Sequence, residues 1–126
     1  MTPPFELRRL DHVSLNVADR VRSIAWYRDV LGLEQRNEPT EDGEPVFMGE
    51  FGACVALFQA QSEAPDRPDE SAGLRHFAFT VDSLEAAEER LREQSVDFRF
   101  EDHGNAHSVY FRDPDDHVIE LTTYVG

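Results

Sequence analysis

The sequence repeats itself at an interval of 64 residues, and this repeat limits the possible folds more than any other feature. Placing L-D-H-V-S-L-N-V-A-D from Leu10 over L-R-H-F-A-F-T-V-D-S from Leu74 brings His12 onto His76 without a gap. The same interval aligns three further pairs, which are Phe47 with Phe111, Val55 with Ile119 and Leu57 with Leu121. One unit of a strand, a helix and about three strands cannot easily bury its own sheet face, so two units should pack together around a shared concavity.

The predicted elements follow the same order in both halves. Alternating residues predict first strands at 10–17 and 74–81, and Asp19 and Ser83 are typical caps of the helices that follow. These helices are expected at about 21–30, where Gly32 ends the first, and at 84–94. The remaining strands are predicted at 46–48, 53–58, 96–100, 108–112 and 117–124. The 126 residues therefore form one domain, with module one at about 8–60, a linker at 61–72 and module two at about 73–124.

The last predicted hairpin carries a carboxylate among apolar residues. It turns at Asp113-Pro114-Asp115-Asp116, and its second strand contains Glu120 between Ile119 and Leu121. A carboxylate is costly to bury unless it is paired, protonated or bound to a cation. The simpler alternative is an edge strand that leaves Glu120 in water.

Three residues form a candidate metal-binding set. His12 and His76 are equivalent in the repeat, each third in its strand, and Glu120 lies centrally in the final strand. Two imidazoles and a carboxylate can occupy one face of a metal's coordination sphere and leave positions open for substrate or oxygen. Each residue alone would more simply be an ordinary hydrogen-bonded or surface side chain. The three together predict a metal site.

A resemblance to a known family rests on four stretches of the sequence, L-D-H-V-S-L-N-V, S-I-A-W-Y-R-D-V-L-G-L, L-R-H-F-A-F-T-V and Y-F-R-D-P-D-D-H-V-I-E-L. Over about 10–124 the chain resembles the vicinal oxygen chelate superfamily, which includes glyoxalase I, bleomycin-resistance proteins, fosfomycin-resistance thiol transferases, extradiol dioxygenases and methylmalonyl-CoA epimerase. The resemblance implies an α+β fold of two tandem βαβββ modules that form an open mixed β-barrel around one divalent metal ion. It places His12, His76 and Glu120 at the ligand positions.

Departures from the family's pattern narrow the expected activity. Glyoxalase I and the epimerase resemble a four-ligand pattern with one donor from the first module, but the corresponding residue here is Ala56. A set of three protein ligands resembles that of the extradiol dioxygenases and the fosfomycin enzymes, whereas bleomycin-binding members lack this metal-binding set. The first expectation is an extradiol-type dioxygenase that chelates a small substrate through adjacent oxygens, with Fe²⁺ or Mn²⁺ favoured and Zn²⁺ or Ni²⁺ as alternatives. A fosfomycin-type thiol transferase, a glyoxalase-like lyase or isomerase, and a non-catalytic small-molecule binder are the other functions.

Three residues that precede Glu120 in the sequence are candidates for proton transfer. Tyr110 comes ten residues before Glu120, where both three-ligand groups place a tyrosine facing the substrate. Its phenol could hydrogen-bond an oxyanion or act as an acid, and ordinary strand packing is the alternative. His103 and His107 precede this strand and could supply a base near neutral pH. His107 is the preferred candidate because it is nearest to Tyr110 in sequence.

Charge excludes several other functions. Against 26 acidic residues the chain has 12 basic ones, all of them arginine, and its net charge is −14. Such a chain repels phosphate backbones and anionic membranes, so neither a nucleic acid nor a membrane is an expected partner. A thiol transferase acting on a phosphonate would have to use Arg75, Arg99 or Arg112 in place of a lysine. Dense carboxylates without lysine also suit high salt and hint at a halophilic source.

The remaining expectations concern location and assembly. No apolar run is long enough to cross a bilayer and the first residues do not resemble a signal peptide, so a cytoplasmic location is expected. Cys54, between Ala53 and Val55, is predicted to be a buried thiol. Exposed sheet edges favour a homodimer. The sequence leaves open whether the metal set forms within one chain or across two.

Overall fold

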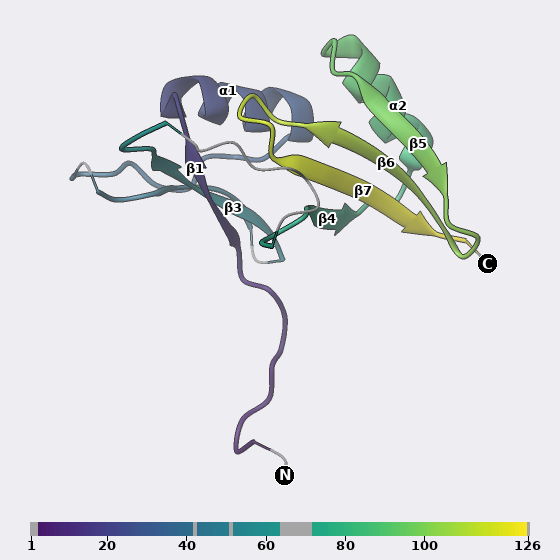
Figure 1. Cartoon of the computed structure of the whole chain (residues 1–126), viewed down its shortest axis with the longest axis horizontal. Helices are drawn as coiled ribbons and strands as arrows, with labels where there is room; N and C mark the ends of the chain where they lie inside the picture. Colours follow the sequence, from purple (N-terminus) through teal and green to yellow (C-terminus); the bar gives the residue numbers. More distant parts are fainter. Residues whose placement is uncertain (1–2, 42, 51, 64–71, 126) are drawn as a thin grey trace.

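The computed structural model describes residues 3–41, 43–50, 52–63 and 72–125. In chain order (Figure 1) the elements are β1 (Val13–Val17), α1 (Arg20–Leu31), β2 (Val46–Glu50), β3 (Ala53–Gln59), β4 (Phe77–Thr80), α2 (Leu84–Glu93), β5 (Phe98–Asp102), β6 (Ala106–Arg112) and β7 (Val118–Tyr124). The predicted α+β class is confirmed. Module two has the expected βαβββ order, whereas module one has the order βαββ within the described residues.

Two sheets carry the repeat. Sheet one has the order β1-β3-β2 and sheet two has the order β4-β7-β6-β5. β1 runs parallel to β3 with Val13 opposite Val55, and β4 runs parallel to β7 with Phe77 opposite Ile119. Phe77 follows Val13 by 64 positions, and Ile119 follows Val55 by the same interval. The interval seen in the sequence is therefore kept in the two parallel ladders.

The antiparallel ladders depart from this interval by one residue. Phe47 lies opposite Ala56, whereas the residue opposite Glu120 is Tyr110. The structural counterpart of Phe47 is thus Tyr110, and the ungapped alignment with Phe111 was wrong. Two residues separate β2 from β3 but five separate β6 from β7. Hairpin length sets strand register, so the longer turn shifts β6 by one position.

Each helix covers the sheet of its own module. α1 packs on β2 and β3, and α2 packs on β6 and β7. Asp19 caps α1 by accepting a hydrogen bond from the Arg22 amide, and Ser83 caps α2 by accepting one from the Ala86 amide. Gly32 ends α1 in the left-handed conformation, as predicted. No helix within the described ranges is both long and apolar enough to cross a membrane.

The modules meet through their helix sides. The Trp26 ring lies 6.2 Å from that of Phe111, and Arg90 Nε donates to the Asp29 carbonyl at 3.0 Å. One cluster of buried side chains includes residues of both modules, among them Val55 and Ile119 at 0% exposure. Cys54 is buried as predicted, and burial raises the pKa of its thiol. The sheet faces turned away from the helices are not covered in the same way.

The two sheets remain separate, so the barrel expected from the resemblance is not closed by the described part of one chain. Several boundaries also differ from prediction. β1 and β4 begin at Val13 and Phe77, after their histidines, because parallel pairing starts there. β5 covers Phe98–Asp102 rather than the predicted 96–100, because Asp102 pairs with His107 of β6. Residues 64–71 of the predicted linker lie outside the described ranges.

Replacement of Gly49 by alanine should destabilise the fold more than the same change at Gly52. Both glycines have positive φ, +97° and +84°, which costs an alanine about 1–2 kcal/mol. A Cβ at Gly49 would also clash with the Ala53 carbonyl oxygen, whereas one at Gly52 meets nothing within 4 Å. Overpacking adds about 1–3 kcal/mol. Urea unfolding of Gly49→Ala and Gly52→Ala measures the difference, and equal midpoints would contradict the predicted clash.

Candidate functional site

His76 and Glu120 converge on the uncovered face of sheet two. β7 places Glu120 opposite Ala78 of β4, and His76 precedes Ala78 by two positions, so both side chains lie on the same face. His76 Nε2 is 2.9 Å from Glu120 Oε1. Ser108 Oγ donates to Glu120 Oε2 at 2.6 Å. The Glu120 side chain is only 13% exposed, so the simpler alternative of an edge-strand carboxylate in water does not hold.

The surroundings keep Glu120 ionised. Burial alone would raise the pKa of its carboxyl group, but hydrogen bonds from Ser108, His76 and Tyr110 outweigh burial and lower the pKa. An ionised carboxylate beside an imidazole nitrogen is a donor pair suited to a divalent cation. Two of the three predicted ligands are therefore brought together by one chain.

Tyr110 completes this cluster. It lies opposite Glu120 on β6, and its ring meets that of His76 edge to face at a centroid distance of 5.5 Å. The guanidinium of Arg99 lies 5.0 Å from the centre of the Tyr110 ring. Burial and the nearby charge of Glu120 raise the pKa of the phenol, so Tyr110 keeps its proton near neutral pH. The structure thus places Tyr110 within the cluster rather than as simple strand packing.

His103, not His107, contacts Tyr110. His103 Nε2 is 3.0 Å from the Tyr110 hydroxyl oxygen. His107 lies three positions before Tyr110 on the same strand, hence on the opposite face, and its Nε2 is 3.5 Å from Asp102 Oδ1. Proximity in sequence therefore did not predict which histidine contacts Tyr110. The useful signal was the hairpin at Gly104, which folds the end of β5 back beside β6 and brings His103 toward the tyrosine.

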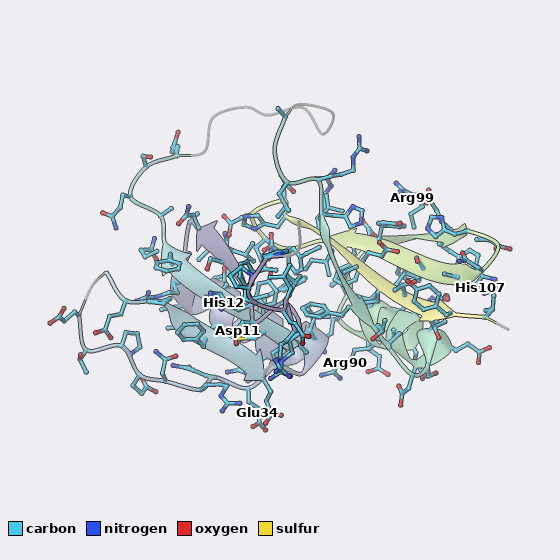
Figure 2. All side chains as sticks on the ribbon, turned by 90° about the horizontal axis from the view of Figure 1, so that it is seen from below. Asp11, His12, Glu34, Arg90, Arg99 and His107 are labelled. Carbon is cyan, nitrogen blue, oxygen red and sulfur yellow. The ribbon has the colours of Figure 1, made fainter. Side chains whose placement is uncertain are left out.

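His12 lies on sheet one in the arrangement that His76 has on sheet two. Its ring meets that of Phe47 edge to face at 5.4 Å and 90°, and the His76–Tyr110 pair has values of 5.5 Å and 89°. The position that matches Glu120 holds Ala56, which is fully buried. His12 Nδ1 contacts Asp11 at 2.8 Å. Figure 2 shows His12 and Asp11 over sheet one, apart from Arg99 and His107 over sheet two.

One chain therefore offers the pair His76–Glu120 and, separately, His12. Within the ranges that the structure describes, no three metal-binding side chains come together. The imidazole and carboxylate of the pair are donors that suit a divalent cation. Two donors are too few to complete a metal site.

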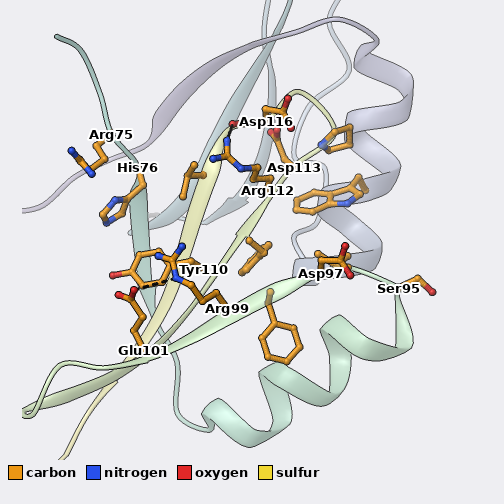
Figure 3. Close-up of a pocket in the computed structure, with 16 residues that line it drawn as sticks. Arg75, His76, Ser95, Asp97, Arg99, Glu101, Tyr110, Arg112, Asp113 and Asp116 are labelled. Carbon is orange, nitrogen blue, oxygen red and sulfur yellow. Dashed lines mark hydrogen bonds and ion pairs between the residues drawn. The ribbon is translucent and has the colours of Figure 1, made fainter. Parts of the chain in front are cut away.

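A pocket of about 950 Å³ begins at this cluster and runs along sheet two (Figure 3). Arg75, His76 and Tyr110 lie toward one end of it, and Ser95 and Asp97 toward the other. Its wall includes Trp26 of α1, so both modules contribute to the pocket.

A buried carboxylate connects the modules beside this pocket. The Asp113 side chain is 0% exposed. Its Oδ2 accepts from the Tyr27 hydroxyl at 2.6 Å and lies 2.8 Å from His117 Nδ1. Its Oδ1 accepts from the amides of Asp115 and His117, both at 2.9 Å. Burial alone would raise the pKa of Asp113, but the hydrogen bonds from His117 and Tyr27 lower it. The predicted D-P-D-D turn is thereby fixed to α1.

The His117–Asp113 contact should make stability depend on pH. The hydrogen bond to Asp113 raises the pKa of His117 against the opposing effect of burial. The stabilisation is complete below the pKa of an unfolded histidine, about 6.5, and is lost as pH rises through the higher folded value. The urea midpoint should therefore fall between pH 6 and pH 9, and this fall should be larger for the wild type than for His117→Gln. An equal fall in both proteins would refute the linkage.

Comparison with known proteins identifies the family. The profile of the Glyoxalase/Bleomycin resistance protein/Dioxygenase superfamily matches residues 9–121, which is most of the chain. The chain belongs to this superfamily. The resemblance found in the sequence is confirmed, and so is the fold that it implies. Superfamily membership covers several reactions and does not select one of them.

Similar proteins within the superfamily differ in activity. The chain is 31% identical over 117 residues to a glutathione transferase, FosA, of Serratia marcescens, with 91% of this chain and 80% of that protein covered. It is 32% identical over 120 residues to a biphenyl-2,3-diol 1,2-dioxygenase of Rhodococcus globerulus, with 90% and 62% covered. The crystal structure of a glyoxylase/bleomycin resistance protein/dioxygenase domain from Frankia sp. EAN1pec superposes with a TM-score of 0.79 at 26% identity, over 95% of this chain and 100% of that domain.

Proposed function

We propose that this protein is a divalent-metal-dependent enzyme acting on a small anionic substrate, with His76, Glu120 and the His12 of a second copy as the metal ligands. The observation that carries the proposal is the contact of His76 Nε2 with Glu120 Oε1 at 2.9 Å, beside Tyr110 and at the end of a pocket. A divalent ion held there would polarise an oxygen of the substrate as a Lewis acid and leave coordination positions open.

The equivalent arrangement of His12 on sheet one and His76 on sheet two supports a shared site in a homodimer. His12 and Phe47 on sheet one match His76 and Tyr110 on sheet two in ring distance and angle. The faces that carry them are not covered by the helices of the chain. In a two-fold dimer, sheet one of each copy can face sheet two of the other, which gives two identical sites. Each site then has two histidines and one carboxylate.

Transfer of a nucleophile to an anionic substrate is the reaction that we favour. Arg75 lies beside His76 at the pocket, and no ion pair to Arg75 is found among the described residues. A guanidinium of this kind can bind a carboxylate or phosphonate group. Tyr110, which keeps its proton, can donate a hydrogen bond to a developing alkoxide. Similarity to the glutathione transferase FosA over most of both chains supports this class.

An extradiol-type dioxygenase is the second candidate. The contact of His103 with Tyr110 at 3.0 Å provides an acid-base pair that could take a proton from a bound diol. Two histidines and one carboxylate suit Fe²⁺, and a relative that acts on biphenyl-2,3-diol supports the candidate. A glyoxalase-like reaction is less favoured because Ala56 provides no fourth donor.

Metal content followed by two assays tests the proposal. Protein purified without oxygen is analysed for metals, and then supplied either with a thiol and an epoxide-bearing phosphonate or with a catechol and O₂. Thiol consumption in the presence of Mn²⁺ supports the first candidate, and O₂ uptake with Fe²⁺ supports the second. Tyr110→Phe should lower kcat about 100-fold in either case, the effect of losing one proton donor, whereas Tyr124→Phe should not. Ligand binding without turnover by metal-loaded protein would indicate a non-catalytic binding protein.

A further inference from the structure

Arg75 marks one end of the large pocket, and among the described residues no carboxylate pairs with it. Three arginines line it, and Arg99 forms an ion pair with Glu101 at 3.1 Å while Arg112 donates to the Asp116 carbonyl at 3.1 Å. Arg75 is exposed beside His76 and has no carboxylate partner within the described part of the chain. An unpartnered guanidinium is unusual in a protein with a net charge of −14, where carboxylates are abundant.

The carboxylates along the pocket do not neutralise this end. Asp113 is buried, and its two oxygens already accept hydrogen bonds from Tyr27 and from two backbone amides while contacting His117. Glu101 is engaged by Arg99 at 3.1 Å and by His103 at 3.7 Å. Asp97 lies toward the far end, and Asp116 lies in the turn beside Asp113 (Figure 3). Glu120, the carboxylate at this end, is engaged by His76 at 2.9 Å and by Ser108 at 2.6 Å. The guanidinium of Arg75 therefore stays available to an anionic ligand.

The wall beyond this end is apolar and comes from both modules. Trp26 of α1 is half-buried, and its ring is 6.2 Å from that of Phe111 at an interplanar angle of 39°. Phe98 and Val118, also half-buried, line the same pocket. Flat aromatic surfaces of this kind bind apolar groups and rings. Trp26 is the only tryptophan of the chain, so its fluorescence reports on this wall alone.

We propose that the pocket selects a small organic acid that carries a flat apolar group, with the acid group at Arg75 and the apolar group against Trp26. The inference deepens the proposed function by naming its substrate class, and rests on that function only in taking the pocket as the substrate site. Binding depends on Arg75 and Trp26 and does not need the metal. Removal of the metal therefore separates the two claims.

Three probes test the two halves of this recognition. Phenylacetate carries both groups, acetate lacks the ring, and 2-phenylethanol lacks the charge. Titration followed by Trp26 fluorescence is done on protein as purified and after dialysis against EDTA, with circular dichroism as a check of folding. We expect saturable binding of phenylacetate in both preparations, and at least about tenfold weaker binding of the other two probes, which corresponds to the loss of about 1.4 kcal/mol for either group.

Variants assign each half to its residue. Arg75→Ala should weaken phenylacetate binding about tenfold and leave 2-phenylethanol unaffected. Arg28→Ala is the matched control, because Arg28 is exposed on α1 and pairs with its neighbour Asp29 at 2.9 Å. Trp26→Leu, followed by calorimetry, should weaken phenylacetate and leave acetate unchanged. Equal affinities of Arg75→Ala and Arg28→Ala, or binding lost after EDTA treatment of folded protein, would overturn the inference. The proposed metal centre would survive either result, since metal content is measured separately.

Discussion

Glu120→Gln is expected to remove the divalent ion from the protein and to leave the fold intact. The change keeps the shape of the side chain and its contact with Ser108, but removes the negative charge that faces His76. Residues that merely support metal ligands already contribute about 10- to 100-fold to metal affinity, so loss of the proposed ligand Glu120 should cost at least about 100-fold. Elemental analysis of protein purified without oxygen measures the effect, with near-stoichiometric metal expected in the wild type.

Glu101→Gln is the control for this experiment. Glu101 lines the same pocket, and its change to glutamine also removes one negative charge. Glu101, however, pairs with Arg99 rather than with His76. Its metal content should equal that of the wild type. If both variants lose metal alike, the general negative charge of the pocket, rather than ligation by Glu120, would hold the ion.

Asp113→Ala should produce the largest loss of stability among the changes considered. It removes the acceptor of the Tyr27 hydroxyl and the partner of His117, and leaves two amides of the turn without their acceptor. Breaking a buried, paired charge costs about 3–5 kcal/mol. Because Asp113 joins the β6–β7 turn to α1, loss of one carboxylate weakens the contact between the modules. Urea unfolding monitored by circular dichroism measures this change in free energy.

Two further variants provide comparisons for the stability loss of Asp113→Ala. Tyr27→Phe removes one hydrogen bond and leaves the other partners of Asp113 in place, so its cost should be smaller, about 1–3 kcal/mol. Asp97→Asn changes an exposed carboxylate near the same pocket and should alter stability by less than about 0.5 kcal/mol. A loss for Asp113→Ala no greater than that for Asp97→Asn would contradict the role of the buried network.

Much of the fold could be predicted because it is determined locally. Asp19 and Ser83 cap their helices and Gly32 ends α1, since these are preferences of single residues that need no distant partner. The repeat fixed the parallel ladders, because both modules pair their first and last strands in the same register. The internal register of β6 depended instead on the length of a turn. The pairing of Tyr110 with Glu120 therefore shows a one-residue shift that ungapped alignment missed.

The site was predicted less completely for a related reason. The unusual place of Glu120 among apolar residues and the equivalence of His12 with His76 suggested a common site, and the contact of His76 with Glu120 was found. Choosing between His103 and His107 required the path of the hairpin between β5 and β6, which depends on tertiary pairing rather than on proximity in sequence. The buried role of Asp113 was also missed, because a D-P-D-D turn by itself is typical of an exposed hairpin. Its signal is Tyr27 on α1, whose hydroxyl needs an acceptor when the ring is fully buried.

Mixed dimers can show whether each metal site takes His76 and Glu120 from one chain and His12 from the other, as we propose. His12→Ala and Glu120→Ala chains are produced with different tags, and the heterodimer is isolated by two affinity steps. Neither variant can form a complete set with itself. The heterodimer, however, has one intact set, made of His12 from the Glu120→Ala chain with His76 and Glu120 from the His12→Ala chain. We predict one tightly bound divalent ion per heterodimer, two per wild-type dimer and none in either parent. A heterodimer as free of metal as its parents would show that the ligands are not shared between chains.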